Sequence, residues 1–126
     1  MKPSIAIIIP CYNEEKTLKT IVERVLNFKD LDKEIIIVDD CSIDSSKIII
    51  KELENLYPEI RGIFLEKNLG KGSALKKGFE EVSGDIVLIQ DADLEYDPKD
   101  YEALIKPIIK SQIKVVYGSR VLNQNR

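Results

Sequence analysis

Acidic side chains follow three apolar, strand-like runs of this 126-residue chain. The first run is followed by Glu14, the second by Asp39 and Asp40, and the third by Asp91 and Asp93. Carboxylates gathered in one place repel one another unless a cation or hydrogen-bond donors offset their charge. The chain has no histidine and no cluster of cysteines, and an oxygen-only ligand set of this kind suits Mg²⁺ or Mn²⁺. The pattern therefore predicts a divalent-metal site.

The pair Asp91 and Asp93 is the strongest candidate for holding the metal. The two residues are two positions apart, so in a regular strand both side chains point the same way. A hard ion bound there keeps open positions that the phosphate oxygens of a ligand can fill, and it neutralises charge on a departing diphosphate. A single aspartate is equally well explained as a solvated strand end or a helix cap. Three acidic strand ends together favour the ligand site.

Four further residues are candidates for ligand contacts at the same place. Asp39 can accept hydrogen bonds from a ribose or a base, whereas Asp40 can instead cap its own loop through an Asx-turn. Tyr12 either stacks on a base or only packs. The basic loop 67–72, with Lys71, precedes a helix N-terminus, which suits a diphosphate, although the loop taken alone is better explained as a solvated helix start. That loop has neither the Walker A pattern nor the dinucleotide-binding glycine pattern.

Strand-like and helix-like segments alternate along the chain. The sequence predicts strands at 4–9, 34–38, 61–65, 85–90 and 114–117. It predicts helices from an N-cap at Asn13 to about 27, from Asp44 or Ser45 to about 56, at 73–82, and from 97 to about 107. The strand runs are continuously apolar instead of alternating, which indicates an α/β fold with a mostly parallel sheet buried under helices on both faces. Ligands of such sheets bind beyond the carboxyl ends of the strands.

Length and composition narrow the class of protein further. The formal net charge of −3 gives no electrostatic reason to expect a nucleic-acid partner. No apolar run approaches the roughly 20 residues of a membrane span, and residues 1–4 show no signal peptide, so we expect one cytoplasmic domain over residues 1–126. Cys11 and Cys41 lack metal-type spacing and are expected to be free thiols.

Five motifs in order give the chain a specific resemblance to a known family. They are IPCYNEE at 9–15, VDDCS at 38–42, NLGKG at 68–72, QDADLE at 90–95 and GSR at 118–120. Together they resemble the inverting family 2 glycosyltransferases, and within these the dolichol-phosphate mannosyltransferase and polyprenyl-phosphate sugar transferase branch. The resemblance covers residues 4–121. It implies a Rossmann-like, three-layer GT-A fold, of which this chain is the N-terminal, donor-binding portion.

The resemblance also implies roles for individual residues. The residues implied to bind the nucleotide-sugar are Pro10, Tyr12, Asn13, Glu14, Asp39, Asp40, Lys71, Asp91, Ala92, Asp93 and Arg120. Pro10, Tyr12, Glu14 and Asp39 would contact the nucleoside, and Arg120 a phosphate. The implied metal ligands are Asp91, Asp93 and Glu95, the last at a position where that branch often carries Gln.

The implied activity is transfer of a sugar from a nucleoside diphosphate, GDP or UDP, with inversion. The implied acceptor is a polyprenyl (dolichyl) phosphate or a glycan at the cytosolic face of a membrane, to which regions outside this chain would attach it peripherally. The family's acceptor side, and often a catalytic base, lie beyond the positions matched here, so no base is assigned. A lipid phosphate needs none, because it is already an anionic nucleophile.

Three other functions compete with this one. A non-catalytic nucleotide-sugar-binding fragment or module would share the donor pocket without turnover. A phospho-acceptor signalling domain is disfavoured because its acidic pair should end the first strand, and here Asp39 and Asp40 end the second. A nicotinamide-binding enzyme is disfavoured because the turn after the first strand contains no glycine.

Overall fold

The computed structural model describes residues 4–27, 32–82, 86–90 and 114–117. Eight elements follow one another: β1 (Ser4–Cys11), α1 (Leu18–Leu26), β2 (Asp32–Asp39), α2 (Ser46–Leu56), β3 (Ile60–Phe64), α3 (Lys71–Glu81), β4 (Ile86–Ile89) and β5 (Lys114–Tyr117). All five predicted strands are confirmed. The helix predicted from residue 97 lies outside the described residues.

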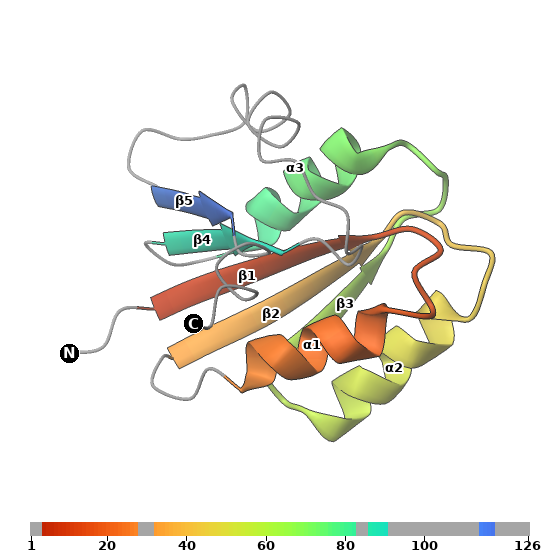
Figure 1. The fold of residues 1–126 in the computed structure, drawn as a ribbon. Helices are drawn as coiled ribbons and strands as arrows, with labels where there is room; N and C mark the ends of the chain where they lie inside the picture. The colour runs from red at the N-terminus through yellow and green to blue at the C-terminus, as the bar shows by residue number, and fades with distance from the viewer. Residues whose placement is uncertain (1–3, 28–31, 83–85, 91–113, 118–126) are drawn as a thin grey trace.

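The sheet has the order β3-β2-β1-β4-β5, and every neighbouring pair is parallel. From β1 the chain moves outward to β2 and β3, and then returns to place β4 on the other side of β1. Because crossovers between parallel strands are right-handed, this reversal puts α1 and α2 on one face and α3 on the other (Figure 1). The gap between the ends of β1 and β4 is the topological switch point, where open sheets of this kind bind their ligands.

Alternate residues of β1 point into the two halves of the core. Ile7 and Ile9 pack in a buried cluster with residues of α1 and α2. Ala6 and Ile8 pack in a second cluster with residues of α3. Both faces of the strand are therefore apolar, which explains the unbroken apolar runs in the sequence.

The predicted start of α1 differs from the structure, whereas that of α2 agrees with it. The prediction of Asn13 as an N-cap is wrong, because α1 begins at Leu18 with Thr17 in the cap position. Asn13 instead adopts a positive φ of 53° and turns its side chain toward another loop. The start of α2 is as predicted: Ser45 occupies the cap position, and the Asp44 carboxylate accepts a hydrogen bond from the Ser46 N–H at 2.8 Å. None of the described helices is both long and apolar enough to span a membrane.

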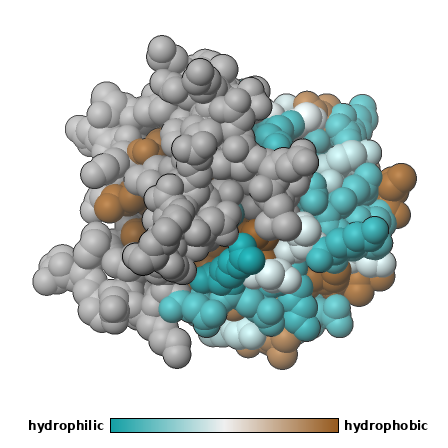
Figure 2. All heavy atoms as spheres, viewed as in Figure 1, coloured by the Kyte–Doolittle hydropathy of each residue, from teal (hydrophilic) through white to brown (hydrophobic). Residues whose placement is uncertain are grey.

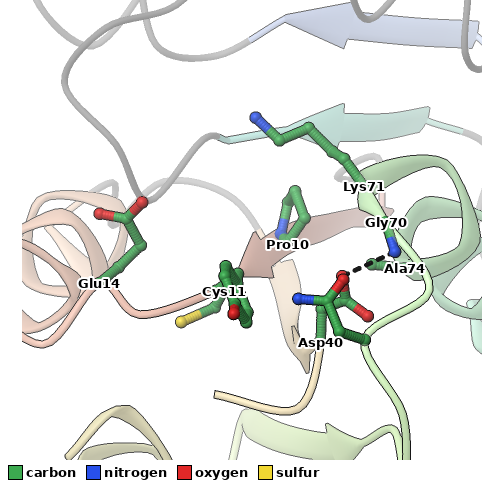
Figure 3. Close-up of a pocket in the computed structure, with 9 residues that line it drawn as sticks. Pro10, Cys11, Glu14, Asp40, Gly70, Lys71 and Ala74 are labelled. Carbon is green, nitrogen blue, oxygen red and sulfur yellow. Dashed lines mark hydrogen bonds between the residues drawn. The ribbon is translucent and has the colours of Figure 1, made fainter. Parts of the chain in front are cut away.

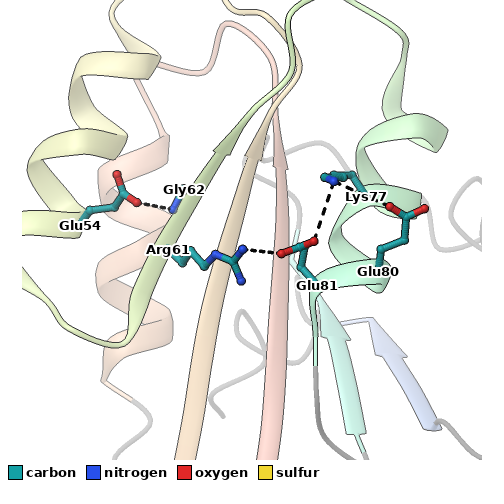
Figure 4. A network of polar contacts seen from close by, with 6 residues as sticks. All are labelled: Glu54, Arg61, Gly62, Lys77, Glu80 and Glu81. Atoms are coloured by element: carbon teal, nitrogen blue, oxygen red, sulfur yellow. Dashed lines mark hydrogen bonds and ion pairs between the residues drawn. The ribbon is translucent and has the colours of Figure 1, made fainter.

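Ion pairs between charged side chains lie on the surface of the fold. Arg61 of β3 pairs with Glu81 at the end of α3, and Lys77 lies 3.8 Å from the same carboxyl group (Figure 4). Such solvent-exposed pairs contribute only about 0–1 kcal/mol each. Hydrophilic residues cover most of the described surface on the face in Figure 2, with apolar patches between them. The two buried clusters, not the ion pairs, therefore hold the helices on the sheet.

Close packing between α3 and the sheet gives a stability prediction for Gly78→Ala. A Cβ at position 78 would lie 2.7 Å from Cγ2 of the fully buried Ile8. Alanine improves helix propensity by roughly 0.5–1 kcal/mol, but overpacking a core costs about 1–3 kcal/mol, so we expect a net loss of stability. Urea unfolding followed by circular dichroism measures it. Lys76→Ala, an exposed change in the same helix, is the control and should show no such loss; a Gly78→Ala protein as stable as the wild type would contradict the prediction.

Candidate functional site

A pocket of about 340 Å³ opens at the carboxyl edge of the sheet. The end of β1 contributes Pro10, Tyr12 and Glu14, the end of β2 contributes Asp40, and the start of α3 contributes Lys71 (Figure 3). The structure thus brings together residues that lie up to 61 positions apart, from Pro10 to Lys71, and all five were predicted from the sequence. The pocket lies beside the switch point of the sheet.

Opposite charges stand on the two sides of this pocket. Figure 3 shows the Glu14 carboxylate on the wall formed after β1, and the Lys71 side chain reaching over Pro10 from the start of α3. The N-terminal end of a helix carries a partial positive charge, which adds to that of Lys71. The α3 side of the pocket is therefore suited to an anionic group, and the Glu14 side to hydroxyl groups.

Asp40 fixes the loop that leads into α3. Its two carboxylate oxygens accept hydrogen bonds from the backbone N–H groups of Leu69 at 2.8 Å and Gly70 at 2.9 Å. The structure does not favour the alternative that Asp40 caps its own loop, because the two N–H groups that its carboxylate binds lie about thirty residues further along the chain. Gly70 has a φ of 97°, a conformation that residues with a Cβ rarely adopt. Asp40 and Gly70 together set the direction from which Lys71 enters the pocket.

Asp39 is fully buried, and only part of its carboxylate is satisfied within the described residues. Oδ2 accepts a hydrogen bond from the Ser42 N–H at 3.0 Å, so Asp39 is the residue that caps the loop after β2. Oδ1 has no hydrogen-bond partner among the described residues. A buried carboxylate oxygen without a partner costs free energy, and such groups occur where a ligand supplies the missing donor. Oδ1 of Asp39 is thus one acceptor at this edge of the sheet that the described residues leave without a donor.

Ser42 and Ser46 were not predicted as site residues. Both are buried, and their hydroxyl groups accept hydrogen bonds from the backbone N–H groups of Asn13 at 2.8 Å and Glu14 at 2.9 Å. These serines join the loop after β1 to the loop after β2. The two serines are four positions apart, close to the acidic pair Asp39 and Asp40 and to the start of a helix. That pattern in the sequence could have identified them as site residues.

Cys11 lines the pocket but is not a nucleophile. Burial raises the pKa of its thiol to about 12, against the smaller lowering effect of a hydrogen bond with Ser46. The thiol is therefore protonated at neutral pH, and only a thiolate attacks readily. Cys11 and Cys41 are both free thiols in the structure.

The predicted metal ligands belong to a segment that the structure does not describe. Asp91, Ala92, Asp93, Glu95 and Arg120 all lie outside the described residues. Within those residues, no group of three or more Cys, Asp or Glu side chains is arranged to hold a metal ion. The Gln90 N–H donates to the Ile8 carbonyl at 3.0 Å, so β4 ends beside β1 at the edge that carries the pocket. The predicted ligands Asp91, Asp93 and Glu95 offer oxygen donors only, and a ligand set of that chemistry suits a hard cation.

Comparisons with known proteins agree with this geometry. Residues 6–125 match glycosyl transferase family 2. The dolichol-phosphate mannosyltransferase of Pyrococcus furiosus is 38% identical over 117 residues, which cover 92% of this chain and 33% of the relative. The undecaprenyl-phosphate 4-deoxy-4-formamido-L-arabinose transferase of Photorhabdus laumondii is 40% identical over 106 residues, 81% of this chain and 33% of the relative.

Solved structures show the same architecture. S. aureus TarS 1-349 aligns with a TM-score of 0.64 and 29% identity over 85% of this chain and 33% of that one. Glucosyl-3-phosphoglycerate synthase from Mycobacterium tuberculosis, in complex with Mn²⁺, UDP and glucosyl-3-phosphoglycerate, aligns with a TM-score of 0.61 and 28% identity over 86% of this chain and 40% of that one. The mannosyltransferase PcManGT from Pyrobaculum calidifontis shares the fold, with a TM-score of 0.67 at 24% identity over 74% of this chain and 28% of that one.

The fold is therefore that of the GT-A glycosyltransferases. The chain itself belongs to glycosyl transferase family 2. It spans about a third of the length of the two curated relatives described above.

Proposed function

We propose that residues 1–126 form the donor-binding domain of a metal-dependent, inverting glycosyltransferase, with a nucleoside-diphosphate sugar as donor. One observation carries the proposal: Tyr12, Glu14, Asp40 and Lys71 line one pocket at the carboxyl edge of the sheet, and the neighbouring buried Asp39 has an oxygen, Oδ1, with no hydrogen-bond partner among the described residues. Membership of glycosyl transferase family 2 supports it. The structural relatives from M. tuberculosis and P. calidifontis were solved with Mn²⁺ and a nucleotide or nucleotide-sugar.

In this proposal the nucleoside occupies the side of the pocket formed after β1. Tyr12, which is 43% exposed, offers a ring face on which a base can stack. Oδ1 of Asp39 accepts a hydrogen bond from a ring N–H, which uracil and guanine both carry, or from a ribose hydroxyl. Pro10 shapes the floor between them, and Glu14 accepts from hydroxyl groups of the donor.

The diphosphate occupies the opposite side. Lys71 and the N-terminal end of α3 attract it, and Arg120 adds a second cation. Asp91, Asp93 and Glu95 would hold Mg²⁺ or Mn²⁺, and the ion would neutralise charge on the leaving diphosphate. Held in this way, the donor presents its anomeric carbon to an acceptor for one in-line displacement, which inverts the configuration.

The acceptor that we propose is a polyprenyl phosphate at the cytosolic face of a membrane. The curated relatives from P. furiosus and Photorhabdus laumondii are named for dolichol-phosphate and undecaprenyl-phosphate. A phosphate acceptor is an anionic nucleophile and needs no protein base. Transfer of labelled sugar to a polyprenyl phosphate would separate this enzyme from a module that only binds the donor.

A thermal-shift screen tests donor binding. UDP, GDP and CDP are each added with MnCl₂ and with EDTA, and we expect UDP or GDP to raise the melting temperature only when Mn²⁺ is present. A ligand at about 100 times its Kd stabilises the folded state by roughly 2.7 kcal/mol, which for a chain of this size corresponds to a shift of several degrees. MnCl₂ alone is the control. If no nucleotide shifts the melting temperature at millimolar concentration, the proposed function is wrong.

A further inference from the structure

The loop after β1 (residues 12–17) and the segment after β2 (residues 40–46) are joined by reciprocal hydrogen bonds. Three consecutive backbone N–H groups of the first donate to side chains of the second. Asn13 N–H donates to Ser42 Oγ at 2.8 Å, Glu14 N–H to Ser46 Oγ at 2.9 Å, and Glu15 N–H to Asp44 Oδ2 at 3.2 Å. The first loop is thus held along its backbone, not only at one side chain.

The same pattern runs in the other direction. Ile43 N–H at 2.9 Å and Asp44 N–H at 3.3 Å both donate to the side-chain carbonyl oxygen of Asn13, and Ser45 N–H donates to Glu15 Oε1 at 2.9 Å. We name these six hydrogen bonds the loop clasp. Asn13 makes half of them, one through its backbone N–H and two through its side chain. It is the central residue of the clasp.

The backbone of Asn13 explains why an asparagine suits this position. Its φ of 53° lies in the left-handed region, which asparagine tolerates better than most residues with a Cβ. A short side chain with a carbonyl oxygen can then reach two adjacent N–H groups across the gap between the loops. Glycine would adopt the same φ but would leave those two N–H groups without the acceptor.

The clasp reaches the pocket through the residues on both sides of Asn13. Tyr12 and Glu14 line the pocket, whereas the Asn13 side-chain oxygen bonds to the β2–α2 segment. Ser42, whose hydroxyl accepts from the Asn13 N–H, donates its own N–H to Asp39 Oδ2 at 3.0 Å. One chain of hydrogen bonds therefore connects the buried carboxylate of Asp39 to the loop that carries the walls of the pocket.

We propose that Asn13 is a positioning residue, which through the loop clasp holds Tyr12 and Glu14 in a fixed place relative to Asp39 before the nucleotide binds. The inference rests on the proposed nucleotide site and gives Asn13 a role different from the direct ligand contact predicted from the sequence. When the loop that carries Tyr12 and Glu14 is already ordered, binding does not have to offset the entropy cost of ordering it. The nucleotide affinity is then higher for the same contacts. Loss of the Asn13 side chain should therefore weaken nucleotide binding without unfolding the domain.

The variants Asn13→Gly and Asn13→Asp separate this role from others. Glycine keeps the backbone conformation and removes the acceptor, while aspartate keeps both. Isothermal titration with UDP and with GDP, each in MnCl₂, should show an affinity about tenfold lower for Asn13→Gly and within about threefold of wild type for Asn13→Asp, since two hydrogen bonds are lost in the first and none in the second. In the protein without ligand, hydrogen exchange at the amides of residues 43 and 44 should speed up in Asn13→Gly only.

Glu54→Ala is the matched control. It removes the acceptor of the Gly62 N–H, a hydrogen bond of 2.8 Å between α2 and β3 that is outside the pocket (Figure 4). It should lower stability by an amount similar to Asn13→Gly and leave nucleotide affinity unchanged.

Three results would overturn the inference. Unchanged affinity in Asn13→Gly would show that the clasp does not position the pocket. Lost affinity with unchanged exchange at residues 43 and 44 would make Asn13 a direct ligand contact. A wild-type protein that binds neither UDP nor GDP with Mn²⁺ would overturn the proposed function and this inference with it, and only that result removes both.

Discussion

Replacing Asp93 by alanine is expected to abolish the part of nucleotide binding that depends on Mn²⁺, while the domain stays folded. In the proposed site Asp91, Asp93 and Glu95 supply the carboxylate oxygens that hold the metal. The affinity of a hard cation depends on the number and charge of its oxygen ligands, so one lost carboxylate weakens the bridge between protein and diphosphate. We expect the Mn²⁺-dependent gain in affinity to fall by about 100-fold or more, which corresponds to roughly 2.7 kcal/mol.

Titrations with the nucleotide that binds the wild type, in MnCl₂ and in EDTA, measure that gain directly. Glu52→Ala, which removes an exposed carboxylate from α2, controls for the change in net charge and should bind like the wild type. Unfolding by urea without ligand should give the same midpoint for Asp93→Ala and the wild type. If Asp93→Ala keeps its full Mn²⁺-dependent binding, the proposed metal site is wrong. The proposed nucleoside pocket would not be affected by that result.

The architecture of the sheet could be predicted because each strand is buried on both faces. The run of isoleucines in β2 packs Ile35 and Ile37 against the α1 and α2 side and Ile36 against the α3 side. A strand covered in this way must be apolar at every position, and the helices between such strands force parallel pairing. Fold class and strand positions therefore follow from composition and spacing alone.

The start of α1 could not be predicted by the same local reasoning. Asparagine before a run of helical periodicity is a common N-cap, and the acidic residues after it strengthen that reading. In the structure the oxygen of Asn13 is taken by the N–H groups of Ile43 and Asp44, thirty residues away. Tertiary hydrogen bonds thus override the local preference, and α1 begins four residues after Glu14, at Leu18.

In the candidate site, too, the position of the residues could be predicted from the sequence, but their hydrogen-bond partners could not. Parallel strands end at one edge of a sheet, so the sequence predicts that residues after β1 and β2 meet there, and Tyr12, Glu14 and Asp40 do line one pocket. Asp39 and Asp40 have different roles because their carboxylates accept hydrogen bonds from different backbone N–H groups. Those partners cannot be predicted from the spacing of residues in the sequence. Asp40 reaches the N–H groups of Leu69 and Gly70, while Asp39 turns back to Ser42.

This difference between the two aspartates leads to opposite expectations for their asparagine variants. Asp39→Asn should lower nucleotide affinity by roughly 100-fold, about 2–3 kcal/mol, because the amide oxygen takes over the Ser42 N–H and leaves an NH₂ group where the ligand needs an acceptor. Its stability should be equal to that of the wild type or higher, since a neutral amide replaces a buried carboxylate whose Oδ1 has no partner among the described residues.

Asp40→Asn is the matched comparison. Both of its oxygens are occupied by backbone N–H groups, and an amide can satisfy only one of them. A part-buried N–H is then left without its acceptor, so Asp40→Asn should lose about 1–3 kcal/mol of stability. Urea unfolding measures the stability of each variant, and nucleotide titration measures its affinity. If Asp39→Asn binds the nucleotide as tightly as the wild type, Oδ1 of Asp39 does not accept a hydrogen bond from the ligand.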